Sequence, residues 1–259
     1  MSRKNSIILA AVVFMVMGVV MAVSAFGFQL YYGNPELLRI AIFGEVLTAV
    51  FIVFWIRRKG SFASVGFSTL KVRGLVWLVP IFLVVLYQFG MIVTEFISRF
   101  DQLSGSTIQL LAIIFVTTLF VGFNEEVTFR GVLLRMLKPD VHPYRAIVIS
   151  ALLFSSFHLL NLIAFIPPGA MLFQLGNTFL FGLFFALVAL KLNNLWPLII
   201  FHALWDFSSI AGDVLAVNLT IPTVITQVFV IVAIVVQLVL LRRHDLSHLK
   251  PTPLTSAKI

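Results

Sequence analysis

The chain contains no cysteine and has few charged residues. Of its 259 residues, 11% are charged and 61% are hydrophobic, whereas about 25% of the residues in a typical soluble domain are charged. The lack of cysteine excludes a disulfide framework, a cysteine-ligated zinc site and a thiol nucleophile. The shortage of charge excludes an ordinary soluble domain and indicates a polytopic membrane protein.

The formal net charge of +8 is the one feature that would suit nucleic-acid binding. The basic residues, however, fall between apolar runs instead of forming one patch. We therefore predict no nucleic-acid partner and expect the lipid bilayer to surround most of the chain.

Eight apolar runs are long enough to cross a bilayer, which takes about 20 residues per helix. We predict an all-α polytopic membrane protein with a single transmembrane domain over 1–241 and a cytoplasmic tail over 242–259. The first run resembles a signal peptide, but it is longer than the apolar stretch of about 7–15 residues in such peptides, so an uncleaved helix is favoured. The predicted spans are 6–28, 36–56, 74–98, 105–136, 144–165, 169–190, 195–212 and 220–241.

The basic residues are distributed unequally between the two sides of this series of spans. With the N-terminus inside, most of the 18 basic residues fall on cytoplasmic segments, and Arg99 falls on an outer segment. Cytoplasmic loops of membrane proteins carry an excess of Lys and Arg. We therefore predict a multi-pass protein of the cell membrane with both termini in the cytoplasm.

Six ionisable residues lie within three of the later spans, where such groups are costly and mark function by default. Counted along the helices, they lie between the middle and the cytoplasmic half of the bilayer. We expect one polar cavity, facing the cytoplasm, to hold them. Arg39 and Glu45 on the second span are interpreted as structural. The six residues are Glu125, Glu126, Arg130, His158, His202 and Asp206.

Helical spacing suggests different roles for these residues. Glu126 and Arg130 are four residues apart, in the order that favours a helical ion pair. Glu125 lies about 140° from Arg130 around the helix axis, so it remains unpaired and available as a base. His202 and Asp206 are also four apart and project from one face. Taken singly, each group also fits a structural role, as a salt bridge, a His–Asp pair or a hydrogen-bonded core histidine.

Two chemistries fit the set as a whole. In one, Glu125 and an imidazole deprotonate a water that attacks a peptide carbonyl, while the other polar groups stabilise the oxyanion. In the other, Glu125, His158 and His202 bind zinc, which activates the water, although no His-Glu-x-x-His motif is present. A serine nucleophile ranks last, because Ser155 and Ser156 lack the helical relation to His158 that would place a hydroxyl against its ring.

Three ordered motifs carry a family resemblance: EEVTFR at 125–130, FSSFH at 154–158 and HALWD at 202–206. They resemble the motifs of the CAAX protease and bacteriocin-processing family (CPBP, or Abi) of intramembrane proteases. The resemblance covers about residues 105–210. It implies an eight-helix fold with a conical cavity open to the cytoplasm and a peptide or membrane-protein substrate. The best understood relatives, type II CAAX prenyl endopeptidases, cleave the C-terminal tripeptide from prenylated proteins.

The resemblance also implies roles for individual residues. Glu125 would activate the water with His158 as its partner, and His202 and Asp206 would form the oxyanion site. The prenyl-processing enzymes carry Asn where this chain has Asp206, which leaves the role of that position open. The resemblance favours a mechanism with no metal cofactor over a zinc-dependent one.

We therefore predict an intramembrane endopeptidase that acts in peptide maturation or bacteriocin self-immunity, with Glu126 and Arg130 supporting the site. One alternative is a non-proteolytic membrane scaffold or immunity protein that keeps the pocket for binding. Another is a proton-coupled transporter, which would also use buried Glu and His side chains. A transporter needs a path to both faces and usually an internal repeat, and we find no repeat in the sequence.

Overall fold

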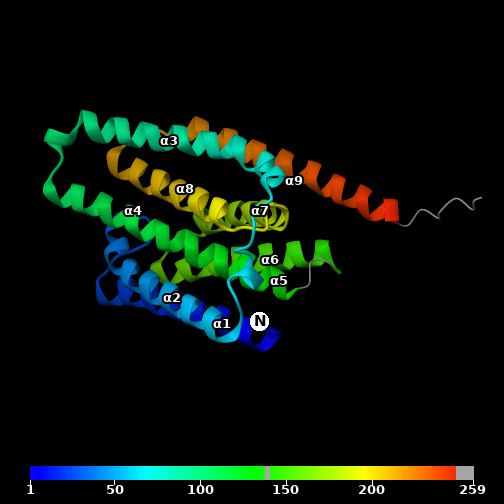
Figure 1. Ribbon diagram of the computed structural model, residues 1–259. Helices are drawn as coiled ribbons and strands as arrows, with labels where there is room; N and C mark the ends of the chain where they lie inside the picture. Colours follow the sequence, from blue (N-terminus) through cyan, green and yellow to red (C-terminus); the bar gives the residue numbers. More distant parts are fainter. Residues whose placement is uncertain (138–140, 249–259) are drawn as a thin grey trace, which may run out of the picture.

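A computed structural model describes residues 1–137 and 141–248, with side chains up to Arg242. Within this part of the chain, eight helical stretches are long and apolar enough to cross a membrane. The predicted all-α membrane fold with eight spans is confirmed (Figure 1). The spans are Arg3–Gly27, Pro35–Lys59, Val79–Ser98, Gly105–Met136, Pro143–Ala164, Pro168–Leu192, Trp196–Leu215 and Thr220–Arg242.

The spans are built mainly from α-helices, and four of them contain a tighter or wider segment. The π-helix Val127–Leu133 follows α4, the π-helix Val23–Gly27 follows α1, the 3-10 helix His158–Ala164 follows α6, and the 3-10 helix Pro35–Leu37 precedes α2. Of the predicted tail at 242–259, the residues up to His248 continue the last helix, and the rest lies outside the described residues. The helices are α1 (Arg3–Ala22), α2 (Leu38–Lys59), α3 (Val79–Ser98), α4 (Gly105–Glu126), α5 (Leu134–Met136), α6 (Pro143–Phe157), α7 (Pro168–Leu192), α8 (Trp196–Leu215) and α9 (Thr220–His248).

Several helix ends follow from local sequence. Ser2 and Ser104 cap α1 and α4, and their side chains accept hydrogen bonds at 3.3 and 3.1 Å from N–H groups of the first turn. The third span begins at Val79 instead of the predicted residue 74, because Val72–Trp77 form a separate 3-10 helix before it.

Helix α4 lies at the centre of the bundle, between α2 on one side and α8 on the other (Figure 1). Its close approach to α8 depends on Gly122, where an added Cβ would lie 2.8 Å from the carbonyl oxygen of Ile199 and 3.1 Å from the backbone nitrogen of Ala203. Small residues at such positions let helix backbones approach closely in membranes. The contact lies about one turn before Glu125 and sets the spacing between the two helices that carry most of the ionisable residues.

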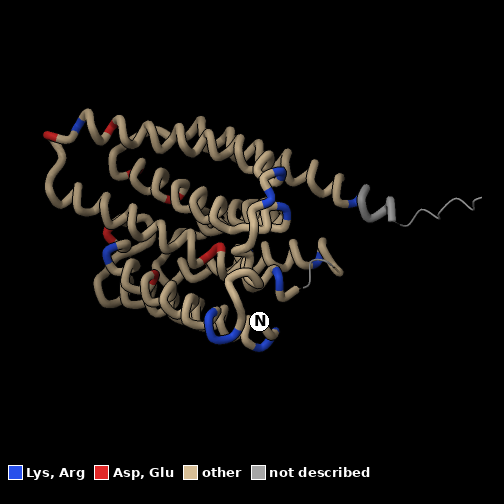
Figure 2. Tube along the Cα trace, in the orientation of Figure 1, with Lys and Arg blue, Asp and Glu red and all other residues tan. Residues whose placement is uncertain are grey.

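The basic residues gather at one end of the bundle, which we call the basic end (Figure 2). Helix α1 begins and α9 ends there, so both ends of the described chain lie on this side. The opposite end carries the connections 28–34, 99–104, 165–167 and 216–219. The basic end is defined by Arg3, Lys4, Arg57, Arg58, Lys59, Lys71, Arg73, Arg145, Lys191 and Arg242.

The close packing of α4 on α8 predicts a large effect from a small substitution. Gly122→Ala forces the two backbones apart, and we expect it to lower the free energy of unfolding by about 1–3 kcal/mol, as overpacking usually does. The measurement is the thermal unfolding temperature of the purified protein in detergent. The control is Gly90→Ala on α3, where an added Cβ meets nothing within 4 Å. An equal effect of the two substitutions would contradict the close contact.

Candidate active site

A cavity of about 550 Å³ holds the four predicted catalytic residues. Glu125 comes from α4, His158 follows α6, and His202 and Asp206 come from α8. The structure thus brings together residues from three spans that are far apart in the sequence. Helices α7 and α9 complete the wall with aromatic and amide side chains, which the sequence analysis did not single out: Phe173, Gln174, Asn177, Phe181, Phe185 and Gln227.

Glu126 and Arg130 lie next to this cavity and are fully buried. The guanidinium Nη1 of Arg130 is 3.2 Å from Oε1 of Glu126, so the ion pair expected from the spacing is present. The guanidinium carbon also lies 3.9 Å from the centre of the Phe154 ring and 5.3 Å from that of Phe185. Cation–π contacts of this kind stabilise a guanidinium that has lost its water.

Glu126 has a second partner that spacing did not predict. Its Oε1 lies 2.9 Å from Nδ1 of His202. Because an ionised carboxylate only accepts hydrogen bonds, Nδ1 of His202 must carry the hydrogen. The bond fixes the orientation of the ring and directs Nε2 toward Asp206, at 3.4 Å, and Glu125, at 3.7 Å. Glu126 therefore connects α4 to the histidine of α8, in addition to pairing with Arg130.

Glu125 differs from Glu126 in facing the cavity. The residue is 9% exposed and lies in the cavity wall. Its Oε2 accepts no hydrogen bond from the described residues. A buried carboxylate oxygen that faces a cavity and an imidazole is well placed to accept a proton from water.

His158 is held by the backbone of its own helix. Its Nδ1 lies 3.0 Å from the carbonyl oxygen of Phe154. A carbonyl only accepts, so Nδ1 carries the hydrogen and Nε2 of the neutral ring is left as an acceptor. The imidazole that the structure places against the Glu125 carboxylate is that of His202. Glu125 and His158, which were predicted to act as partners, line the same cavity.

Glu45 fixes the residue that precedes Glu125. The side-chain nitrogen of Asn124 donates to the backbone oxygen of Glu45 at 2.8 Å and to its Oε2 at 2.6 Å. Both residues are buried, so the two bonds join α2 to α4 just before the carboxylate pair. This geometry agrees with the structural interpretation of Glu45.

The segment after Glu126 is a π-helix, Val127–Leu133, which carries Arg130. Such segments are rare and occur frequently at functional sites. The carbonyl oxygen of Phe129 accepts a hydrogen bond from Ser150 Oγ at 3.0 Å. Side-chain hydroxyls of neighbouring helices commonly satisfy backbone groups at irregular points of membrane helices. The bond also holds α6, which leads into His158, against this segment.

The cavity extends from the catalytic residues along α7, away from the basic end. Its wall follows α7 from Phe185 to Ala170, which is about 22 Å of helix, and it reaches Tyr32 and Thr223 at the opposite end.

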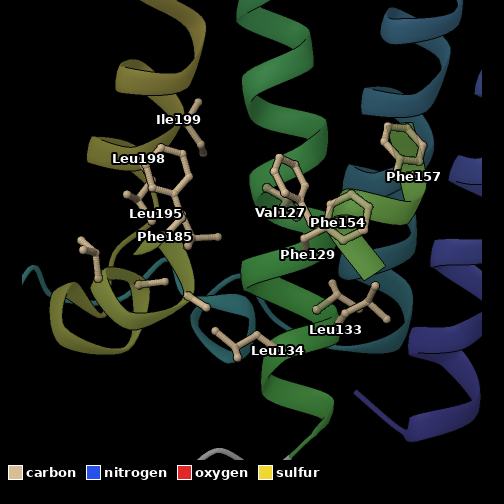
Figure 3. Close-up of a cluster of buried hydrophobic side chains, with 14 of the residues drawn as sticks. Val127, Phe129, Leu133, Leu134, Phe154, Phe157, Phe185, Leu195, Leu198 and Ile199 are labelled. Atoms are coloured by element: carbon tan, nitrogen blue, oxygen red, sulfur yellow. The ribbon is translucent and has the colours of Figure 1, made fainter. Parts of the chain in front are cut away.

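Buried apolar side chains from the segments that follow Glu126 and precede His202 belong to one cluster (Figure 3). Each of them is buried. These residues are Val127, Phe129, Leu133, Leu134, Leu195, Leu198 and Ile199.

The site does not fit zinc in its present arrangement. Among the described residues, no three His, Asp or Glu side chains are placed to hold a metal ion. The hydrogen bonds of Nδ1 in His158 and His202 leave only Nε2 of each ring as a possible ligand atom. We therefore derive no chemical step through a metal.

Residues 107–208 match the family model described as type II CAAX prenyl endopeptidase Rce1-like. This part of the chain is similar to the Rce1-like family. The Rce1-like segment contains all three motifs and runs from α4 into α8, so the resemblance inferred from the motifs is confirmed. No match is found among curated proteins or among solved structures. The family to which this segment is similar is one of CAAX-type membrane proteases.

The buried ion pair of the Rce1-like segment predicts a stability defect. Arg130→Met leaves the Glu126 carboxylate without its cation, and breaking a buried pair in this way costs about 3–5 kcal/mol. We expect less folded protein in the membrane and a lower unfolding temperature in detergent. Arg99→Met is the control, because Arg99 forms an i,i+4 pair with Glu95 at 3.3 Å, with 42% and 37% of the two side chains exposed. If both variants unfold at the wild-type temperature, the buried pair is not a structural support.

Proposed function

We propose that this protein is an intramembrane endopeptidase in which Glu125 activates a water molecule for attack on a peptide bond. The observation that carries the proposal is the free Oε2 of Glu125, which faces a cavity and an imidazole held in place by a second carboxylate. The Rce1-like match supports the reaction class.

The first step uses the groups on the α4 side of the cavity. Glu125 takes a proton from water, and the hydroxide attacks the carbonyl carbon of the scissile bond. The acceptor Nε2 of His158 is suited to receive the second O–H of the same water, because Nδ1 is already committed to Phe154. Glu125 then returns the proton to the leaving amine as the C–N bond breaks.

The groups on α8 are suited to the charge that develops on the carbonyl oxygen. In its protonated form, His202 donates Nδ1–H to Glu126 and carries a second hydrogen on Nε2. This second hydrogen points toward the cavity, where it can donate to the oxyanion. Asp206 lies 3.4 Å from this nitrogen and takes part as a hydrogen-bond donor only in its protonated form. We propose that His202 is the main oxyanion donor and that Asp206 orients it.

Peptide maturation and self-immunity against bacteriocins are the biological roles that we propose, because both require a protease that meets its peptide at the membrane. A protein that only binds in this pocket would need its carboxylates for shape or charge, and not for proton transfer. The two possibilities differ in their response to an isosteric change at Glu125.

Glu125→Gln should abolish peptide hydrolysis while leaving the amount of folded protein unchanged, because the amide keeps the shape of the carboxylate and cannot accept the proton. The measurement is cleavage of a quenched fluorescent peptide library by purified protein in lipid. The control is Glu95→Gln, near the C-terminal end of α3 and outside the cavity wall, and it should retain activity. Retained hydrolysis in Glu125→Gln would refute the assigned base, and binding with no hydrolysis in the wild type would favour the scaffold alternative.

Removal of metal ions should leave the activity intact, since the assigned steps use only side chains. The measurement is peptide cleavage after prolonged chelation, together with elemental analysis of the same sample for zinc. The zinc-dependent alternative makes the opposite prediction: activity falls on chelation and returns when zinc is added back.

A further inference from the structure

The cavity wall carries two amide side chains, Asn177 on α7 and Gln227 on α9, that the assigned catalytic steps do not use. Gln227 lies beyond residues 107–208, so the Rce1-like segment does not include it. Helices α7 and α9 pack against each other, and Nε2 of Gln227 donates to Oδ1 of Asn177 at 3.4 Å. The two side chains thus form one group on the wall, which we call the amide pair.

The hydrogen bonding of the amide pair is incomplete. An amide side chain offers two N–H donors and one carbonyl oxygen, and the bond between the two residues leaves Nδ2 of Asn177 and Oε1 of Gln227 with no partner among the described residues. Gln174, on the same wall, differs, because its Oε1 accepts from Asn161 at 3.0 Å and its Nε2 donates to the hydroxyl of Tyr32 at 2.9 Å. Gln174 therefore joins parts of the protein, whereas the amide pair keeps a donor and an acceptor for a ligand.

A free donor beside a free acceptor matches the main chain of an extended peptide. One residue of such a chain presents its N–H and its C=O on the same edge, so Nδ2 of Asn177 can donate to the C=O and Oε1 of Gln227 can accept from the N–H. The wall around the pair is aromatic, from Phe173, Phe181 and Trp205. Peptide groups in apolar surroundings are costly when they lack partners, so these bonds favour binding of the chain.

We propose that the amide pair is a substrate-binding subsite that holds the backbone of one residue of an extended peptide chain. This inference rests on the proposed peptidase function, because it assigns the pair to the substrate of the same site. The pair carries no charge and bonds to main-chain groups, so it selects the extended conformation of the substrate and not a particular side chain at that position.

The position of the subsite along the substrate follows from α7. Asn177 and Phe185 both line the cavity and are separated by about 12 Å along the helix. The ring centre of Phe185 lies 6.1 Å from that of His202, so Phe185 marks the level of the catalytic residues. Because an extended chain advances about 3.3 Å per residue, a substrate that runs along α7 places the residue about three or four positions from the cleaved bond at the amide pair.

A double-mutant cycle between protein and substrate tests the subsite. In a peptide that the wild type cleaves, each backbone amide is replaced in turn by an ester, which removes a single N–H. Gln227→Leu removes the acceptor, and we expect KM to rise about 3–10-fold with kcat unchanged, because the lost bond is remote from the reacting atoms. The ester three or four positions from the cleaved bond should raise KM equally in the wild type and have no further effect in Gln227→Leu.

The control is Gln109→Leu, which removes an exposed amide of α4 outside the cavity wall and should leave KM unchanged. Gln227→Met keeps the length of the side chain and repeats the measurement where Gln227→Leu lowers the amount of folded protein. Equal ester sensitivity in the wild type and the Gln227 variants would overturn the subsite, as would a fall in kcat with no change in KM. An effect confined to the ester next to the cleaved bond would overturn its position and with it the inference.

A binding measurement separates this inference from the proposed function. Fluorescence anisotropy gives the affinity of fluorescent library peptides for the Glu125→Gln variant in lipid, with and without Gln227→Leu. Binding that weakens about 3–10-fold with Gln227→Leu, in a protein whose wild type cleaves no peptide, would support the subsite and refute the peptidase. Cleavage and binding that are both insensitive to Gln227→Leu would keep the peptidase and remove the subsite. A wild type that neither cleaves nor binds any peptide would refute both.

Discussion

The site depends on the buried carboxylate of Glu126, which contacts a guanidinium and an imidazole at the same time. Oε1 of Glu126 contacts the guanidinium of Arg130 at 3.2 Å and the imidazole of His202 at 2.9 Å. An isolated charge is costly in the hydrocarbon region, so each group needs the other two. Because Arg130 follows Glu126 on the same span and His202 comes from α8, satisfying this charge also fixes the rotation of α4 relative to α8. The free carboxylate of Glu125 is then held at a set position.

Packing makes this arrangement possible. Gly122 lets the backbones of α4 and α8 approach, and Asn124 ties α4 to α2 through Glu45. Gly122 and Asn124 lie on opposite faces of the same helical turn of α4, immediately before Glu125. Buried apolar side chains pack next to the site, whereas the cavity wall carries polar side chains. The same helices therefore provide both the rigid support and the access to the site.

The sequence predicted those features that depend on local spacing. Eight spans follow from the lengths of the apolar runs, and the Glu126–Arg130 pair follows from an i,i+4 spacing. The contact between Glu126 and His202, and the position of Arg130 over two aromatic rings, depend on how separate helices rotate against one another. No spacing within one helix encodes them. The start of the third span was misplaced because a 3-10 segment has the composition of the helix that follows it.

The separation of catalytic residues from orienting charges has a consequence for the Rce1-like fold. The reactive side chains lie on inward faces of α4 and α8 and in the turn after α6, whereas the basic residues lie at helix ends and in connections. The bilayer orients a chain by those terminal charges, and none of the basic residues lines the cavity. A substitution at a helix end can therefore change the charge of that end without altering the residues of the cavity wall.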